Sequence, residues 1–290
     1  MLSYRHAFHA GNHADILKHV VLTRIIEYLK KKEKPFVYFD THAGGGLYDL
    51  KGNEASKTGE HEHGIARLLE RRSELGPLFA PYLEILKQLN PDSALRIYPG
   101  SPAIAGKLLR SQDRMALMEL HSSEIQILKK NMNAREDRRI AIHFRDGFEG
   151  LVALTPPEIR RGLALMDPSY EQTEDYAKVV DTARKVLKKW PGATLAIWYP
   201  HLAGDKDHSL FMREKFRKLA AEEVLEASLC PASPQDGAEG MYGSAMMIAN
   251  PTFGLKEELD EIINILLPAL KTGERASGGV RYIVGGSGGI

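Results

Sequence analysis

The sequence predicts an α/β protein in which helices cover both faces of a mainly parallel sheet. Two observations carry this prediction. Short apolar runs alternate with segments whose apolar residues recur at helical spacing. The alternation breaks once, between residues 49 and 93, where two helical patterns follow each other with no strand between them. We therefore expect a parallel sheet with an inserted helical subdomain.

The apolar pattern places each element in turn. Strands of the sheet are expected at 36–39, 95–98, 115–118, 140–144, 163–166, 194–199, 224–230, 245–249 and 280–284. Long helices are expected at 14–32, 59–72, 77–89, 175–189, 209–222 and 256–270, and shorter ones follow residues 102, 123 and 147. The expected divisions are an N-terminal flap with the first helix and strand (1–48), the helical insertion (49–93), the rest of the α/β domain (94–284) and a flexible glycine-rich tail (285–290).

The composition is that of an ordinary globular protein. The 290 residues are 43% hydrophobic and 27% charged. No segment approaches the ~18 apolar residues of a membrane span, and the single cysteine, Cys230, fits a reducing cytoplasm. Because the net charge is only +1, a nucleic-acid partner would have to meet a local basic face. The basic run 30–34 fits either such a contact or the solvated end of a helix.

Three of the expected strands end in groups suited to a nucleoside. The first ends at Asp40 and leads into the glycine-rich turn 43–46, which a ligand could approach closely. A later strand ends at Glu119, and an acid in that place binds ribose hydroxyls in dinucleotide-type folds. Another ends at Asp146-Gly147, which suits the edge of an adenine. Taken singly, these groups also fit a tight turn, a solvated glutamate and a helix N-cap.

A fourth strand ends in the tetrapeptide Asp-Pro-Ser-Tyr at 167–170. The Asp167 carboxylate and the Pro168 carbonyl can each accept one N–H of an exocyclic amine, and Tyr170 offers a flat face to the base. Alone, the tetrapeptide is more typical of an ordinary turn. The order of all four groups along the chain is the layout of a Rossmann-like, class I S-adenosylmethionine-dependent methyltransferase, and this is the fold and chemistry that we expect.

The N-terminal segment carries four histidines between residues 6 and 19, together with Asp15. Histidines at this spacing suggest zinc, but the segment holds no cysteine, and we expect no metal. Two other interpretations are a poorly ordered end and a flap that orders over cofactor and RNA. In the flap, Arg5, Lys18 and the histidines suit phosphates, while Tyr4 and Phe8 suit stacking.

The chain resembles the RlmJ-type bacterial 23S rRNA adenine-N6 methyltransferases nearly end to end. The resemblance rests on the opening block 1–19 and on Asp40-Thr41-His42-Ala43-Gly44, Tyr98-Pro99-Gly100-Ser101-Pro102, Glu119-Leu120-His121, Asp146-Gly147 and Trp198-Tyr199-Pro200. It implies methyl transfer from S-adenosylmethionine to N6 of one adenine of 23S rRNA, number 2030 in conventional rRNA numbering. The substrate would be naked 23S rRNA or an assembly intermediate, and we expect a monomer.

The resemblance also implies roles for single residues. The residues assigned to the cofactor are His19, His42, Ser101, Glu119, Asp146, Gly147 and Asp167. Those assigned to catalysis are Asp167, Pro168 and Tyr170, and those assigned to RNA are Tyr4, Arg5, His6 and Lys18. The family usually has Asp-Pro-Pro-Tyr, so Ser169 is a departure that loosens the turn and adds a hydroxyl.

Other functions remain open from the residues alone. The strand-end groups fit a methyltransferase that acts on DNA adenine, on cytosine N4 or on a glutamine side chain. An RNA-binding module that has lost catalysis is a further alternative, in which Ser169 would be a symptom of the loss.

Overall fold

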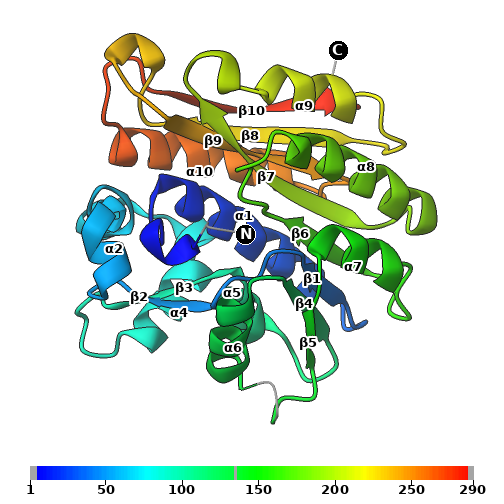
Figure 1. The fold of residues 1–290 in the computed structure, drawn as a ribbon. Coiled ribbons are helices and arrows are strands. Elements are labelled where there is room, and N and C mark those ends of the chain that lie inside the picture. The colour runs from blue at the N-terminus through cyan, green and yellow to red at the C-terminus, as the bar shows by residue number, and fades with distance from the viewer. Residues whose placement is uncertain (1–4, 134–135, 287–290) are drawn as a thin grey trace.

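An eight-stranded sheet forms the centre of the fold (Figure 1). The structure is a computed structural model and describes residues 5–133 and 136–286. The strands of this sheet are β1 (Val37–Asp40), β4 (Arg114–Glu119), β5 (Ile140–Phe144), β6 (Gly162–Met166), β7 (Thr194–Leu202), β8 (Val224–Cys230), β9 (Met241–Ala249) and β10 (Ser277–Val284).

The strand order is β10-β8-β9-β7-β6-β1-β4-β5. The pairs from β5 through β7 are all parallel, whereas β9 runs antiparallel to β7 and β8, and β10 antiparallel to β8. The predicted Rossmann-like, mainly parallel sheet is therefore confirmed. The chain builds β4 and β5 on one side of β1 and then crosses to β6 on the other, which creates a switch point where such folds bind ligands.

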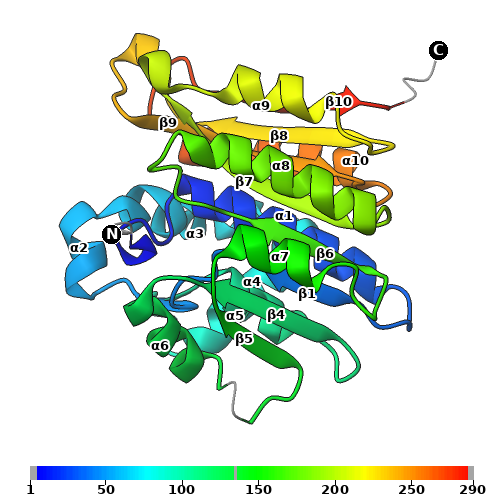
Figure 2. The same ribbon diagram turned by 45° about the vertical axis from the view of Figure 1, so that its right-hand side comes forward.

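Helices cover both faces of the sheet (Figure 2). They are α1 (His13–Lys30), α5 (Ser101–Leu108), α6 (Ser122–Asn131), α7 (Gly147–Leu154), α8 (Glu174–Lys189), α9 (Ser209–Phe216) and α10 (Leu255–Leu270). Because side chains alternate along a strand, Leu163 and Leu165 pack in the core shared with α1 and α10. Ala164 and Met166 pack in the other core, with α7 and α8. Among the described residues, no helix combines the length and the apolarity needed to cross a bilayer.

The segment between β1 and β4 is mostly helical. Its elements are β2 (Leu47–Asp49), α2 (Asn53–Thr58), the π-helical turn η2 (Glu62–Ala66), α3 (Arg67–Glu70), the 3-10 turns η3 (Arg72–Glu74) and η4 (Pro77–Phe79), α4 (Ala80–Leu89) and β3 (Ile97–Pro99). The strand expected near 95–98 in the central sheet is a wrong prediction, because β3 pairs antiparallel with β2 in a separate two-stranded sheet. Ile65 and Tyr82 of this segment share the core of α1.

Three short 3-10 turns complete the chain: η1 (His6–Phe8), η5 (Gly204–Lys206) and η6 (Pro234–Asp236). The first lies in the N-terminal segment, which runs beside α2 in both ribbon views. The Thr58 hydroxyl donates to the carbonyl of Phe8, and the Lys57 ammonium lies over the Phe8 ring. The segment between β2 and β3 therefore contacts the turn η1.

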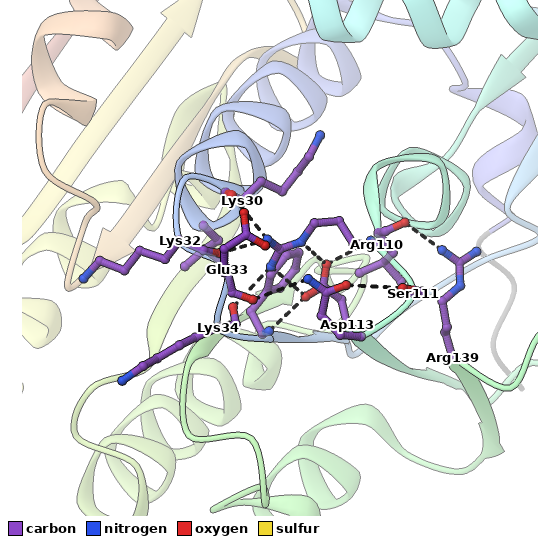
Figure 3. A network of polar contacts seen from close by, with 12 residues as sticks. Lys30, Lys32, Glu33, Lys34, Arg110, Ser111, Asp113 and Arg139 are labelled. Atoms are coloured by element: carbon purple, nitrogen blue, oxygen red, sulfur yellow. Dashed lines mark hydrogen bonds and ion pairs between the residues drawn. The ribbon is translucent and has the colours of Figure 1, made fainter.

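The basic run 30–34 lies at the edge of the sheet where β1 begins, opposite the edge where β1 ends. The Arg110 guanidinium donates to the backbone carbonyls of Lys30, Lys32 and Lys34, at 3.3, 2.9 and 3.2 Å (Figure 3). Asp113 binds the Nε of the same guanidinium at 2.9 Å. Arg110 thus satisfies carbonyls that the end of α1 leaves free.

Candidate active site

The carboxyl ends of β1, β4 and β6 meet at one edge of the sheet. Asp40 at the end of β1 is in register with Leu117 of β4 and with Leu165 of β6. The backbone N–H of Thr41 continues the ladder and donates to the Leu165 carbonyl at 3.1 Å. This pairing brings the loops after Asp40, Glu119 and Met166 together.

A pocket opens at this edge. It collects most of the residues predicted to bind the cofactor, together with two of those assigned to RNA. The predicted residues in its wall are His6, Lys18, His19, His42, Ser101, Glu119 and Asp167. The other residues of the wall are Ala43, Gly44, Tyr48, Gly100, His121, Glu124 and Ser169. We call this hollow the cofactor-side pocket.

Glu119 ties the glycine-rich turn to the end of β4. Its carboxylate accepts the N–H of Gly44 at 2.8 Å and the N–H of His121 at 2.6 Å. Gly44 has a φ of 59°, and a Cβ there would overlap the Tyr48 hydroxyl, so the turn needs glycine. Burial raises the pKa of the Glu119 carboxyl. The acid is thus fixed in the wall of the cofactor-side pocket.

Asp40 is fully buried behind the pocket. Its Oδ2 accepts the hydroxyls of Tyr38 and Ser101, at 2.6 and 2.7 Å, and its Oδ1 accepts the N–H of His42 at 3.3 Å. Burial raises the pKa of Asp40 to about 6, although these hydrogen bonds oppose the shift. The carboxyl therefore orients Ser101 and the loop that carries His42.

His19 presents a neutral ring to the pocket. Its Nδ1 lies 3.0 Å from the Tyr98 hydroxyl, and burial lowers the pKa of the imidazole to about 3. The Nε2 atom is buried and has no hydrogen-bond partner among the described residues. A buried polar atom without a partner is costly unless a ligand supplies one. His19 therefore fits a polar group of a cofactor.

Lys18 lies between two carboxylates. Its ammonium is 2.8 Å from Asp15 and 2.6 Å from Asp167, and only 4% of the residue is exposed. Burial alone would lower the pKa of Lys18, but the two carboxylates outweigh it and raise the pKa. Asp15 also accepts from His6 at 2.9 Å, and its pKa is held well below its ordinary value by His6 and Lys18 despite burial. The sequence did not predict this buried ion cluster.

The tetrapeptide 167–170 is held in an unusual conformation. Tyr170 has a φ of 52°, which is uncommon for a bulky residue. Its hydroxyl donates to the carbonyl of Trp198 at 2.7 Å, and its ring packs on Tyr176 with the centroids 4.4 Å apart. Pro168 is buried, and the Ser169 hydroxyl accepts the N–H of Glu171 at 3.5 Å, a long contact. Neighbouring strands and helices thus fix the Tyr170 ring.

A second hollow, of about 240 Å³, lies on the other side of Asp167, and we call it the base-side pocket. It shares His6, Lys18, Asp167 and Ser169 with the cofactor-side pocket. Its remaining wall consists of His9, Asn12, Ala14, Asp15, Tyr170, Trp198, Pro200, Leu202 and Met241. The predicted catalytic carboxylate therefore stands at the junction of two pockets, one of them lined by aromatic rings.

Four predicted residues in the described part of the chain, Pro168 among them, lie outside the walls of both pockets. Asp146 accepts the N–H of Glu149 at 2.9 Å and caps α7, and it lines a separate hollow with Phe148 and Lys178. Gly147 packs against the Thr41 backbone, where a Cβ would overlap the carbonyl oxygen. Neither is in the wall of the cofactor-side pocket. Arg5 pairs with Glu54 and, at 3.1 Å, with Glu124. Tyr4 lies outside the described residues.

Two histidines of the N-terminal segment lie next to carboxylates. His6 contacts Asp15, and His9 lies 2.7 Å from Glu60, which raises the pKa of His9. In the described ranges, no group of three or more histidine, cysteine or acidic side chains has the geometry to hold a metal ion.

Sequence reasoning missed part of the wall. Tyr48, His121 and Glu124 line the cofactor-side pocket without having been assigned to it. His121 directly follows a predicted strand end, so its position was a usable signal. Glu124 meets Arg5 across 119 positions of the chain, and no local pattern predicts such a pair.

Comparisons with known proteins agree on one family. The sequence profile described as "Ribosomal RNA large subunit methyltransferase D, RlmJ" matches residues 33–283. The chain is 42% identical to ribosomal RNA large subunit methyltransferase J of Haemophilus influenzae, over 93% of this chain and 94% of that one. It is 39% identical to the protein of the same name from Escherichia coli, over 91% and 92%.

A solved structure is similar over the whole fold. A crystal structure of a Legionella pneumophila protein is 34% identical, with a TM-score of 0.86, and the match covers 94% of this chain and 98% of that one. The chain therefore belongs to the RlmJ family of ribosomal RNA large subunit methyltransferases, enzymes of Rossmann-like fold that use S-adenosylmethionine as methyl donor.

Proposed function

We propose that this chain transfers a methyl group from S-adenosylmethionine to N6 of an adenine in 23S rRNA. We propose position 2030 for that adenine, by resemblance to the family. The observation that carries the proposal is the junction of the cofactor-side and base-side pockets at Asp167. A methyl donor in one pocket and a base in the other would meet beside this carboxylate.

The cofactor-side pocket fits the donor in its chemistry. Glu119 would bind the ribose hydroxyls, and the unpartnered Nε2 of His19 would bind a polar group of the amino-acid part. Ser101 and His42 would complete the wall. Asp146 and Gly147 would act from behind it, by placing α7 against the loop after β1.

The mechanism that we propose depends mainly on the alignment of the adenine N6 with the methyl group. S-adenosylmethionine supplies the methyl group as an electrophile on a sulfonium. The amine of adenine is a poor nucleophile, because its lone pair is delocalised into the ring. Hydrogen bonds from N6 to Asp167 and to the Pro168 carbonyl would favour a pyramidal nitrogen and aim its lone pair at the methyl group. As N6 gains positive charge it loses one proton, to Asp167 or to water.

The base would be held by aromatic side chains. Tyr170 and Trp198 lie 6.0 Å apart, centroid to centroid, in the base-side pocket. A splayed-out adenine stacks on such rings. His6 and Lys18, which line both pockets, would contact the target nucleotide. Arg5, whose guanidinium pairs with Glu54 and Glu124, keeps its assignment to RNA as part of this proposal. Tyr4 keeps its assignment to RNA as part of this proposal.

We propose further that the enzyme acts as a monomer in the cytoplasm, without a metal ion, on naked 23S rRNA or on an assembly intermediate. Residues 49–93 would form a helical insertion within one catalytic domain (1–48 and 94–284), followed by the tail 285–290. The contacts of this segment with the N-terminal residues and with α1 support a role in shaping the RNA entrance.

Isotope transfer tests the proposal. Purified enzyme and S-adenosylmethionine labelled in the methyl group are incubated with unmodified 23S rRNA, with unmethylated DNA or with a glutamine-bearing peptide. We expect label in the rRNA alone, and in N6-methyladenosine after digestion. Label in DNA, in N4-methylcytosine or in the peptide would support another amine substrate, and no label in any of them would support a module that only binds RNA.

A further inference from the structure

A third hollow borders the base-side pocket and has no part in the mechanism above. Its volume is about 500 Å³, and we call it the outer cavity. It shares His9, Asn12 and Met241 with the base-side pocket, so the two are separated only by these side chains. The rest of its wall comes from four places: His13 at the start of α1, Glu60 and His63 of the segment between β2 and β3, the β8–β9 connection with Tyr242 of β9, and Leu270 and Thr272 at the end of α10.

Hydrogen bonds hold residues of the partition between the two hollows. Glu60 of the insertion lies 2.7 Å from the His9 Nδ1 and accepts the Asn12 amide at 2.9 Å. On the other side, β9 carries Met241 and Tyr242, and the Tyr242 hydroxyl donates to Asp207 at 3.1 Å. The outer cavity is therefore present in this structure as a space with its own wall.

The charge of the wall excludes phosphate as the preferred occupant. The ionisable groups of the outer cavity are Glu60, Glu239, Tyr242 and three histidines, and no lysine or arginine lines it in the described part of the chain. Carboxylates repel a phosphate but accept N–H groups. The buried Nε2 of His13 has no hydrogen-bond partner among the described residues, and burial lowers the pKa of this ring to about 4, so it is neutral.

Apolar and aromatic groups complete the wall. Met241, Tyr242, Pro231 and Leu270 give it flat and apolar surface. The Tyr242 ring is stacked on His201, with the planes 22° apart, which fixes its orientation. Such a surface, bordered by acceptors, suits a heterocycle with an exocyclic amine.

We propose that the outer cavity binds the nucleobase adjacent to the target adenine in the RNA chain. The inference rests on the proposed function, because it takes the base-side pocket as the site of the target base. An adenine turned into that pocket brings its neighbour to the pocket's rim, and the outer cavity shares that rim. Holding a second base would fix the register of the RNA and keep the target base out of its helix.

The first arm of the test removes the neighbouring base from the RNA. Wild-type enzyme is first shown to methylate full-length 23S rRNA, and the modified adenine is mapped. Synthetic RNA fragments centred on it are then made with an abasic site at the 5′ or the 3′ neighbour. Loss of one neighbour should raise KM about 5- to 150-fold, the effect of losing one stacked base, while loss of the other should have little effect.

The second arm fills the outer cavity. Ala238→Trp places a large ring in its wall, and Gln235→Trp places the same ring on the exposed face of the same connection, outside the wall. Ala238→Trp should raise KM for intact RNA as the abasic neighbour does, and should show no further increase with the abasic RNA. Gln235→Trp should behave as wild type. Thermal unfolding of both variants checks that they fold.

Three results would overturn the inference. The first is an equal KM for intact RNA and for both abasic RNAs. The second is an Ala238→Trp effect on KM no larger than that of Gln235→Trp. The third is that Ala238→Trp weakens the salt dependence of RNA binding while the missing base has no effect on KM. The last would identify the occupant as a phosphate. If wild-type enzyme fails to methylate the full-length RNA, the proposed function fails, and that outcome is separate from these three.

Discussion

The ammonium of Lys18 lies 2.6 Å from the Oδ2 of Asp167, although 149 positions of the chain separate the two residues. Asp15 holds the same ammonium from the other side at 2.8 Å. The carboxylate that we assign to the target amine is therefore oriented by a buried cation, and its second oxygen is the one to which an N6–H would bind.

Replacement of Lys18 tests this arrangement. Lys18→Met would leave two buried carboxylates facing each other without a cation. We expect the free energy of unfolding to fall by about 3–5 kcal/mol, as when one partner of a buried pair is removed. The control is Lys31→Met, an exposed lysine just after the same helix, with an effect within about 0.5 kcal/mol. Equal denaturation midpoints for the two variants would show that the cluster does not stabilise the fold.

Two substitutions at Tyr170 separate its hydroxyl from its ring. Tyr170→Phe removes only the hydrogen bond to the Trp198 carbonyl, and should cost about 1 kcal/mol of stability with little change in KM for RNA. Tyr170→Ala removes the stacking surface and should weaken RNA binding by ~1–3 kcal/mol. RNA titrations and thermal unfolding measure both effects. Unchanged RNA binding in Tyr170→Ala would show that the Tyr170 ring does not contact the base.

A single methyl group at position 147 should disturb the cofactor-side pocket from behind. In Gly147→Ala the new Cβ would overlap the Thr41 carbonyl, so α7 or the loop before His42 must move. We expect a loss of about 1–3 kcal/mol in stability and weaker binding of S-adenosylmethionine, measured by calorimetry. Gly192→Ala is the matched control, because a Cβ there meets nothing within 4 Å. Cofactor affinity equal in both variants would contradict this role for Gly147.

The pKa of Asp40 predicts a pH dependence of stability. Its folded pKa of about 6 lies above its ordinary value of 3.8, so between these values the folded state keeps a proton that the unfolded state releases. Stability relative to Asp40→Asn should therefore fall as pH rises from about 4 to 6, by about 3 kcal/mol in all, and then stay level. Denaturant unfolding at pH 4.5 and 7.5 should show about 2 kcal/mol of this change, because part of it already occurs below pH 4.5. A difference that does not change with pH would show that burial does not shift this carboxyl.

The sheet could be predicted because its strands are short apolar runs. The edge that carries the site could also be predicted, because the carboxyl ends of parallel strands meet at one edge of a sheet. The pairing of β2 with β3 could not be predicted, because strands of three residues are too short to show an alternation of apolar and polar residues. β9 begins at Met241 and β10 at Ser277, each ahead of its prediction, since Gly243, Gly278 and Gly279 look like loop in the sequence. Pairing with β7 and β8 extends these strands through the glycines.

The site was predicted from the types of residue at the strand ends. The hydrogen bonds of Glu119 and Asp40 explain why acidic residues stand there, because their carboxylates hold the loops around the pocket in place. Partners far apart in sequence were not predicted. Arg5 and Lys18 looked like free cations for phosphate, yet Glu54, Glu124, Asp15 and Asp167 compensate them. Asp15 is three positions before Lys18 on the same helix, but only the folded chain brings Glu54, Glu124 and Asp167 near these cations, so no local pattern shows those three pairs.

Methyl transfer to unmodified 23S rRNA by wild type and by Asp167→Ala tests the central claim most directly. N6-methyladenosine is quantified after digestion, and S-adenosylmethionine binding is measured by calorimetry on both proteins. We predict N6-methyladenosine with wild type only, and cofactor affinity nearly equal in the two. Substantial N6-methyladenosine formation by Asp167→Ala would contradict the assignment of this carboxylate to the target amine.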